Sequence, residues 1–148
     1  VKRYSTAGLG PSQGRHANLN TIRVVGGVTG LNQQIVINAG GSTLGFYEKP
    51  LLLGSSGSFY SDQSGLVILS VTGNTWGSTL SAGGTLRIDL PDALPSNSLL
   101  RLGVGYSTNG AVDLNGNNQT VAGLQSGTSA GGVDCFRSTK IVVWPATV

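Results

Sequence analysis

The chain has little charge, few aromatic residues, one cysteine and no methionine among its 148 residues. The single cysteine, Cys135, excludes an internal disulfide, and no C-x-x-C pair is present for a zinc site. Charged residues make up 10% of the chain, against roughly 25% in an ordinary soluble domain. The surface must therefore consist of Ser, Thr, Asn, Gln and Gly, which suits a protein outside the cell. Because a ribosomal product begins with Met, we expect this chain to be processed or excised from something longer.

Long apolar runs and helical patterns are also missing. No stretch approaches the roughly 18 apolar residues of a membrane helix, and no window keeps apolar residues at helical spacing. Short apolar stretches are bounded instead by Gly, Asn, Ser or Pro. With aromatics at 6%, the core must be filled by Val, Ile and Leu. The sequence predicts one all-β domain, with strands at 22–25, 34–38, 43–46, 66–71, 85–90, 99–104, 111–114, 120–124 and 141–144.

Dense clusters of charge are absent as well. Nine basic and six acidic residues give a net charge of +3, and they are dispersed apart from Lys2 and Arg3. Nucleic-acid binding normally needs a dense basic patch, so no nucleic-acid partner is expected. The sole histidine, His16, lies in a polar stretch, which disfavours a histidine triad or a multi-histidine metal site. We predict no metal site and no cofactor.

Short apolar strands recur at intervals of about 19 to 26 residues, which lie in the range of solenoid repeats. One interval fits one coil of a parallel β-helix, in which equivalent strands stack about 4.8 Å apart. A single coil cannot bury its inward residues, so neighbouring coils must stabilise one another. Two inward columns are predicted. One contains Leu44, Val67, Leu86 and Val112, and the neighbouring one contains Phe46, Leu69, Ile88 and Leu114.

Several motifs follow one another in a fixed order along the middle of the chain. They read SGLVIL at 64–69, TGNTWG at 72–77, LSAGGTLRI at 80–88, DALPS at 92–96 and DLNGNNQTVAGL at 113–124. Together they resemble the autotransporter-associated β-strand repeat of bacterial secreted proteins over residues 64–126, with a fainter echo at 35–46. The chain departs from the family pattern at Leu66 and Ile68, where the family exposes Thr, and in the turn at Trp76, which is about one residue short.

The resemblance implies a right-handed parallel β-helix in a secreted or cell-surface passenger region of a bacterium. Such regions are stalks or scaffolds without catalytic residues. We accordingly divide the chain into an extended N-terminal arm at 1–21, a β-solenoid of about six coils at 22–126 and a C-terminal closing strand segment at 127–148. Residues outside 22–126 match no family motif.

The two ends lack the polar caps that natural solenoids carry. The last predicted strand is strongly apolar, and the basic, Gly-containing arm is of a kind that adds a strand to a neighbour's sheet. We predict a structural subunit that associates head to tail into a homopolymer, since a heterologous contact gives an open filament unless it closes. The predicted contact residues are Val1, Lys2, Arg3, Ile141, Val142, Val143 and Trp144.

Outward positions offer smaller sites. Arg87 and Asp113 are predicted to stack as an opposite-charge pair on adjacent strands. The corner residues Asn74, Asn115, Asn117 and Asn118 are interpreted as structural, because Asn bonds to nearby backbone and tolerates left-handed geometry. Trp76 matches the family's turn aromatic and is interpreted as structural too. For surface glycans, the candidate contacts are Tyr60 and Tyr106.

Three alternatives remain open beside the structural subunit. A glycan-binding adhesin module would use the exposed tyrosines. A polysaccharide lyase or hydrolase would need two or three neighbouring carboxylates, for which only Asp89, Asp92 and Asp113 are candidates, so we predict no catalytic residue. A jelly-roll capsid protein with a basic arm is the third alternative, although strands spaced by about 23 residues do not favour a sandwich core.

Overall fold

The computed structural model describes residues 21–62, 64–103, 110–126, 135–137 and 141–143. Over these residues the protein is all-β without a helix, and every strand pairing is parallel. The strands wind into a β-solenoid of about four turns. The predicted all-β class and the parallel solenoid are therefore confirmed. In the part of the chain that is described, no helix is long and apolar enough to cross a membrane.

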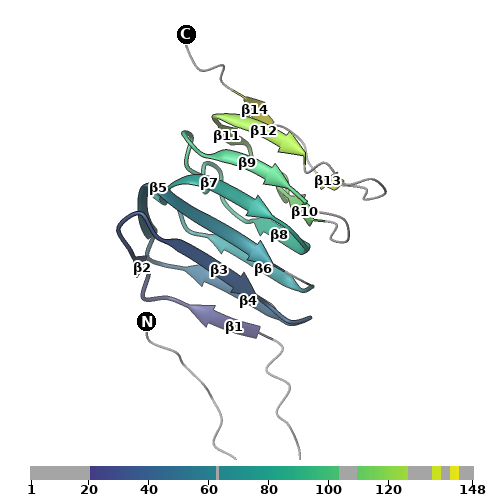
Figure 1. Ribbon diagram of the computed structural model, residues 1–148. Coiled ribbons are helices and arrows are strands. Elements are labelled where there is room, and N and C mark those ends of the chain that lie inside the picture. The colour runs from purple at the N-terminus through teal and green to yellow at the C-terminus, as the bar shows by residue number, and fades with distance from the viewer. Residues whose placement is uncertain (1–20, 63, 104–109, 127–134, 138–140, 144–148) are drawn as a thin grey trace, which may run out of the picture.

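The first sheet extends along the solenoid from its N-terminal to its C-terminal end (Figure 1). Its six strands pair in sequence order, so each coil adds one rung to the ladder. Their register runs without a shift, because one coil stacks directly on the previous one. The strands are β1 (Thr21–Val24), β4 (Thr43–Tyr47), β6 (Leu66–Ser70), β8 (Gly84–Ile88), β10 (Gly110–Asp113) and β13 (Cys135–Arg137).

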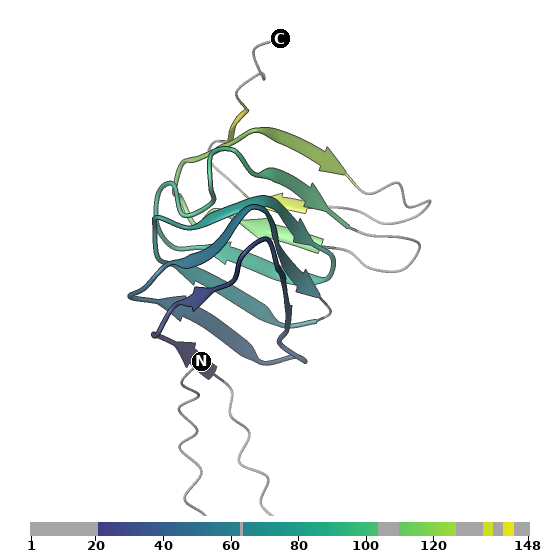
Figure 2. The same cartoon turned by 60° about the vertical axis from the view of Figure 1, so that its left-hand side comes forward.

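The second sheet faces the first across a narrow interior (Figure 2). The chain alternates between the sheets, passing from β4 to β5, from β6 to β7 and from β8 to β9. A further short pair completes the late coils. The second sheet contains β2 (Val28–Thr29), β3 (Gln34–Asn38), β5 (Leu51–Asp62), β7 (Thr75–Ser81), β9 (Leu99–Leu102) and β12 (Gly123–Ser126), and the short pair is β11 (Gln119–Val121) with β14 (Ile141–Val143).

The inward columns of the first sheet follow the predicted register. Leu44 is the partner of Val67, Val67 of Leu86, and Leu86 of Val112. In the neighbouring column Phe46, Leu69 and Ile88 are aligned in the same way, and Leu114 is buried just beyond the end of β10. Both predicted columns therefore form the interior wall, because a period of two sends alternate side chains to the same face.

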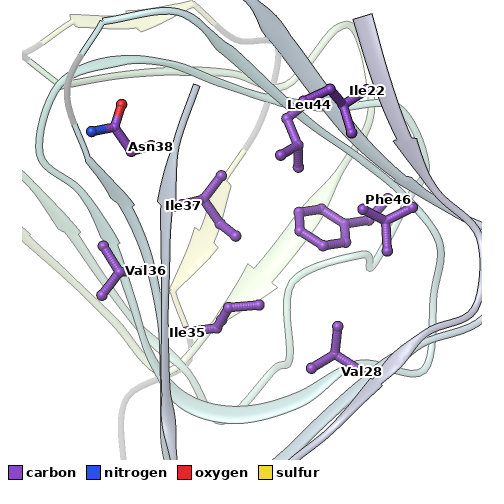
Figure 3. A pocket seen from close by; sticks show the side chains of 9 residues that line it. Ile22, Val28, Ile35, Val36, Ile37, Asn38, Leu44 and Phe46 are labelled. Carbon is purple, nitrogen blue, oxygen red and sulfur yellow. The ribbon is translucent and has the colours of Figure 1, made fainter. Parts of the chain in front are cut away.

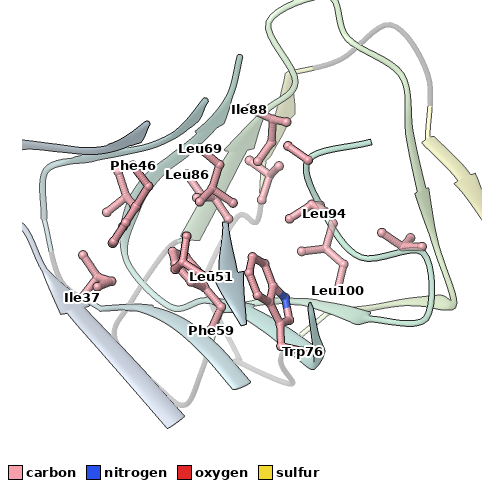
Figure 4. Close-up of a cluster of buried hydrophobic side chains, with 14 of the residues drawn as sticks. Ile37, Phe46, Leu51, Phe59, Leu69, Trp76, Leu86, Ile88, Leu94 and Leu100 are labelled. Carbon is pink, nitrogen blue, oxygen red and sulfur yellow. The ribbon is translucent and has the colours of Figure 1, made fainter. Parts of the chain in front are cut away.

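Three aromatic side chains pack together in the core (Figure 4). Trp76 stacks on Phe59 with ring centroids 5.2 Å apart, and Phe46 meets Phe59 edge-on at 5.9 Å. The Trp76 indole donates to the Thr79 hydroxyl at 2.7 Å, and Thr79 in turn bonds to Ser98. The prediction that Trp76 lies in a turn is wrong, because it lies in β7 and is fully buried. It is structural, but as a core residue.

Side-chain amides join successive coils at the turns. Asn74 accepts from the Leu51 amide and donates to the Val71 and Ala93 carbonyls, each at 2.8 Å. Gln119 likewise joins two coils nearer the C-terminus. It accepts from the Leu94 amide and donates to the Leu90 carbonyl.

The other corner asparagines bond locally and to the coil below. Asn117 donates to the Ile88 carbonyl at 3.0 Å. Asn115 adopts a left-handed backbone with φ of 47° and donates to Asp89. The structural interpretation of Asn74, Asn115 and Asn117 is confirmed by these bonds.

Two expectations about the fold are not confirmed. The central strands β5 and β7 were absent from the predicted set, since Gly and Ser in 54–58 and 77–78 break the apolar pattern. The expected six coils are also not confirmed, because the described residues amount to about four turns. The last rungs, β13 and β14, pair with β10 and β11 without a further strand of the second sheet in the described part of the chain.

Gly77 sits where β7 passes closest to β5, at an irregular part of their register. A Cβ at this position would collide with the backbone carbonyl oxygen of Ser55, which cannot move without breaking the ladder. We expect Gly77→Ala to lower the free energy of unfolding by about 1–3 kcal/mol, the usual cost of overpacking. Urea denaturation followed by circular dichroism measures it. Gly26→Ala is the matched control, because nothing lies within 4 Å of its added Cβ, and equal effects of the two variants would contradict the argument.

Candidate functional site

An apolar pocket opens at the N-terminal end of the solenoid. It encloses about 450 Å³ between β1 and β4 on one wall and β3 on the other, with Val28 beside them (Figure 3). Ile22, Leu44 and Phe46 face Ile35 and Ile37 across this space. The lining residues are Ile22, Val24, Val28, Ile35, Val36, Ile37, Asn38, Leu44 and Phe46.

The pocket is the open end of the core. Ile22 stands first in the column that continues through Leu44, Val67 and Leu86. Its side chain is 41% exposed, whereas Val67 is 2% exposed and Leu86 is fully buried. These residues have the same chemistry and the same register position. Ile22 is exposed because the described chain places no rung beneath it.

Backbone groups at this end are open in the same way. Within the described residues β1 pairs only with β4, and β3 pairs only with β5. The outer edges of β1 and β3 therefore carry amide and carbonyl groups that can pair with an added strand. An apolar hollow bordered by strand edges that have no partner among the described residues is suited to receive another β-rung.

The described lining of the pocket is almost entirely apolar. Its one polar residue, Asn38, lies on the outer side of β3 (Figure 3) and accepts a hydrogen bond from the Gly40 amide at 3.0 Å. No carboxylate, histidine or cysteine lines it. Across the described residues, no group of three or more His, Cys, Asp or Glu is placed to hold a metal ion. What the site offers is apolar contact and strand pairing.

A cation–π contact fastens the outer face of β1 beside the pocket. The Arg23 guanidinium lies 4.1 Å from the centroid of the Tyr47 ring. The ring also lies across Gly45, where a Cβ would collide with it. This contact holds the edge strand β1 against β4. The rim of the pocket is therefore held in place by a side-chain contact as well as by strand pairing.

At the C-terminal end the second sheet finishes with a matching exposed residue. Leu124 ends the column that begins at Ile35 and passes through Phe59, Thr79 and Leu100. Leu124 is 44% exposed, while Phe59, Thr79 and Leu100 are fully buried. The same inward column is therefore only partly covered at both of its described ends.

Arg87 and Asp113 are register partners in β8 and β10. The Arg87 guanidinium, however, bonds Asp89 just beyond the end of β8, with Nε 2.6 Å from the carboxylate. Asp113 accepts from the Asn115 amide at 2.9 Å. The two residues stack through their backbones, and their side chains bond to different partners.

Tyr60 and Asp113 lie in different sheets, and Asp113 and Asp89 both bond to Asn115. Tyr60 lies half-buried on β5, and its hydroxyl donates to Asp62 at 3.4 Å. Desolvation and the neighbouring Asp62 carboxylate raise the pKa of Tyr60 above its ordinary value. Tyr106 falls outside the described residues. Asp89 and Asp113 are both engaged in structural hydrogen bonds.

The predicted contact residues fall partly inside the described chain. Ile141, Val142 and Val143 form β14, which extends the ladder from β11. Val1, Lys2, Arg3 and Trp144 lie outside the described residues, as does His16. Sequence reasoning did not single out the pocket residues Ile22, Ile35 and Val36. The strands that contain them were predicted. The available signal was their place in the chain, because these are the first predicted strands and they come before the repeat motifs.

Comparison with known proteins yields one partial match. A family model described as the sarcosine oxidase A3 domain matches residues 1–43. The part of this match that the structure describes comprises β1, β2, β3 and the first residue of β4. No curated protein matches the chain. No solved structure matches it.

Proposed function

We propose that this protein is a structural β-solenoid subunit that associates head to tail into a filament or surface layer outside the cell. The observation that carries the proposal is the open pocket at the N-terminal end. It exposes Ile22 at the start of a column whose later members are buried. Burying such apolar surface stabilises an assembly by about 25 cal/mol per Å² before the costs of association.

The remaining features agree with a repetitive extracellular scaffold. The resemblance to autotransporter-associated repeats supports a right-handed helix, as does the strong right-handed preference of parallel crossover connections. The six strands of the first sheet support six coils in the full chain. A surface low in charge and rich in Ser, Thr, Asn and Gly supports a secreted or cell-surface location.

A glycan-binding module is the second candidate, and one observation favours it. Tyr60 stands in an outward column of the second sheet, between its register partners Val36 and Leu80. With its hydroxyl directed to Asp62, the ring lies along the strand beside polar groups. Binding of the purified chain to a glycan array would support this candidate.

The head-to-tail proposal is tested by a charge placed at the pocket. We expect the protein to form concentration-dependent oligomers or fibres in light scattering and negative-stain electron microscopy. Ile22→Glu buries a carboxylate in the joint and should weaken association at least about tenfold, equivalent to about 1.4 kcal/mol. Leu90→Glu is the matched control, since Leu90 is similarly exposed at 36% but lies in a turn away from the pocket.

A monodisperse monomer at high concentration would overturn the proposal. Equal weakening by Ile22→Glu and Leu90→Glu would show that association does not use the N-terminal end.

A further inference from the structure

We infer that the first sheet continues in register across the joint, so that β13 of one copy pairs in parallel with β1 of the next copy. This inference rests on the proposed head-to-tail association and names its contact surface. It places Cys135 of one copy opposite Thr21 of the next, Phe136 opposite Ile22, and Arg137 opposite Arg23. The occupant of the pocket mouth is thus a second copy of this chain.

The register follows from the ladder already present in the first sheet. Equivalent positions align from β1 to β13 with no shift at any of the five pairings. The register position of Thr21 continues in turn through Thr43, Leu66, Thr85, Ala111 and Cys135. The second sheet, by contrast, contains register shifts between β5 and β7. The first sheet is therefore the regular template on which another rung can be added.

The inward column that begins at Ile22 can continue across the joint into the next copy. Its described members are all apolar, namely Ile22, Leu44, Val67, Leu86 and Val112, and the next register position is that of Phe136. An added rung in the same register brings the Phe136 position next to Ile22, at the mouth of the pocket.

Other registers are less favourable. A slip of one residue would turn the inward set of a strand to the outer face, and would set Arg137 or Cys135 against Ile22. A slip of two residues would move Phe136 out of line with Ile22 and leave at most two residues of β13 opposite β1. The in-register joint is the one that continues both the hydrogen-bond ladder and the apolar column.

One contact in this joint is unfavourable, and it makes the register testable. Arg137 shares the position of Asp113 and, across the joint, would stand beside Arg23. Like charges opposite each other on adjacent strands are destabilising. Removing the charge at 137 should therefore strengthen the joint, whereas an acidic residue there would face Asp113 of its own chain. Loss of positive charge elsewhere should not strengthen it.

The decisive experiment uses the single native cysteine. Register partners on adjacent parallel strands lie about 4.8 Å apart, within the range of about 4.4–6.8 Å between Cα atoms that a disulfide spans. Thr21→Cys should therefore join to Cys135 of the next copy on mild oxidation. A non-reducing gel should then show a ladder of dimers, trimers and longer species. Within one chain the two positions are five rungs apart, about 24 Å, so an intramolecular bond is excluded.

Three controls fix the interpretation. The native chain has one cysteine and can give dimers at most, as can Thr21→Cys combined with Cys135→Ser. Thr43→Cys adds a cysteine in the same column but one rung farther from the joint, and should give no ladder. A ladder from Thr43→Cys as strong as that from Thr21→Cys would overturn the register.

Charge removal gives a second, independent readout. We expect Arg137→Gln to tighten association by up to about fivefold in light scattering, the range for one like-charge pair. Arg101→Gln, which makes the same change in net charge on the exposed face of β9, should not. Equal responses of the two variants would overturn the inference. Association of the native protein without a Thr21→Cys ladder would refute the register and leave the proposed function standing, whereas a native monomer would refute both.

Discussion

Trp76→Ala is expected to lower the free energy of unfolding by about 3–5 kcal/mol, the range for truncating a buried large aromatic side chain. The indole is fully buried and stacks on Phe59 at 5.2 Å. Its removal leaves a cavity beside Phe59, between strands fixed by their ladders. The measurement is the urea midpoint by circular dichroism, which does not depend on tryptophan fluorescence.

Two further variants separate the contributions of Trp76. Trp76→Phe keeps a ring but loses the 2.7 Å bond to Thr79, whose hydroxyl still bonds Ser98 at 2.8 Å. We expect the free energy of unfolding to fall by about 1–2 kcal/mol, because the ring is smaller and one hydrogen bond is lost. Leu52→Ala is the control, because Leu52 is 40% exposed. A Trp76→Ala variant no less stable than Leu52→Ala would contradict the assignment of Trp76 to the core.

The second large effect is expected at Asn74. This buried amide accepts from Leu51 and donates to Val71 and Ala93, so it connects three successive coils. Asn74→Ala leaves three backbone groups without these partners, and each unsatisfied buried group costs about 1–3 kcal/mol. Because water that enters the gap satisfies some of these groups, we expect the free energy of unfolding to fall by about 3–5 kcal/mol.

Chemical denaturation again measures the effect of Asn74→Ala, and Asn97→Ala is the matched control. Asn97 is an exposed turn residue in the next coil, so its truncation should change stability by less than about 0.5 kcal/mol. If the two alanine variants unfold at the same urea concentration, the amide does not hold the coils together.

The first sheet was predictable from sequence because its inward positions are occupied by large apolar residues at alternate places. Leu86 and Ile88, for example, flank Arg87 on β8, and this alternation marks a half-buried strand. Stacking the repeats then gave the register without knowledge of the turns. The column through Leu44, Val67 and Leu86 came directly from this pattern.

The second sheet was harder to predict because its interior contains small and polar residues. Thr79 and Ser81 on β7 are buried as completely as the leucines of the first sheet, with their hydroxyl groups in hydrogen bonds. In sequence these positions read as surface. Burial of a hydroxyl depends on a partner brought in by another coil, such as Ser98, and sequence spacing alone does not indicate that partner.

The pocket was not predictable for a different reason. Ile22 and Val67 are similar residues at the same register position, and only their place in the stack makes one exposed and the other buried. Local sequence does not record how many rungs lie beneath a strand. The predicted contact surfaces were accordingly placed at the chain termini, whereas the pocket belongs to the first described rungs.

The parallel ladder also determines how the molecule responds to tension. Its interstrand hydrogen bonds run along the solenoid axis, so a pull on the two ends strains the contact between one rung and the next. Each rung touches only its neighbours, and successive positions of the first sheet are 19 to 26 residues apart. A detached coil therefore releases roughly 60–95 Å of extended chain. The coils that Asn74 and Gln119 join carry extra hydrogen bonds, so we expect them to separate later than the others and the molecule to lengthen in steps.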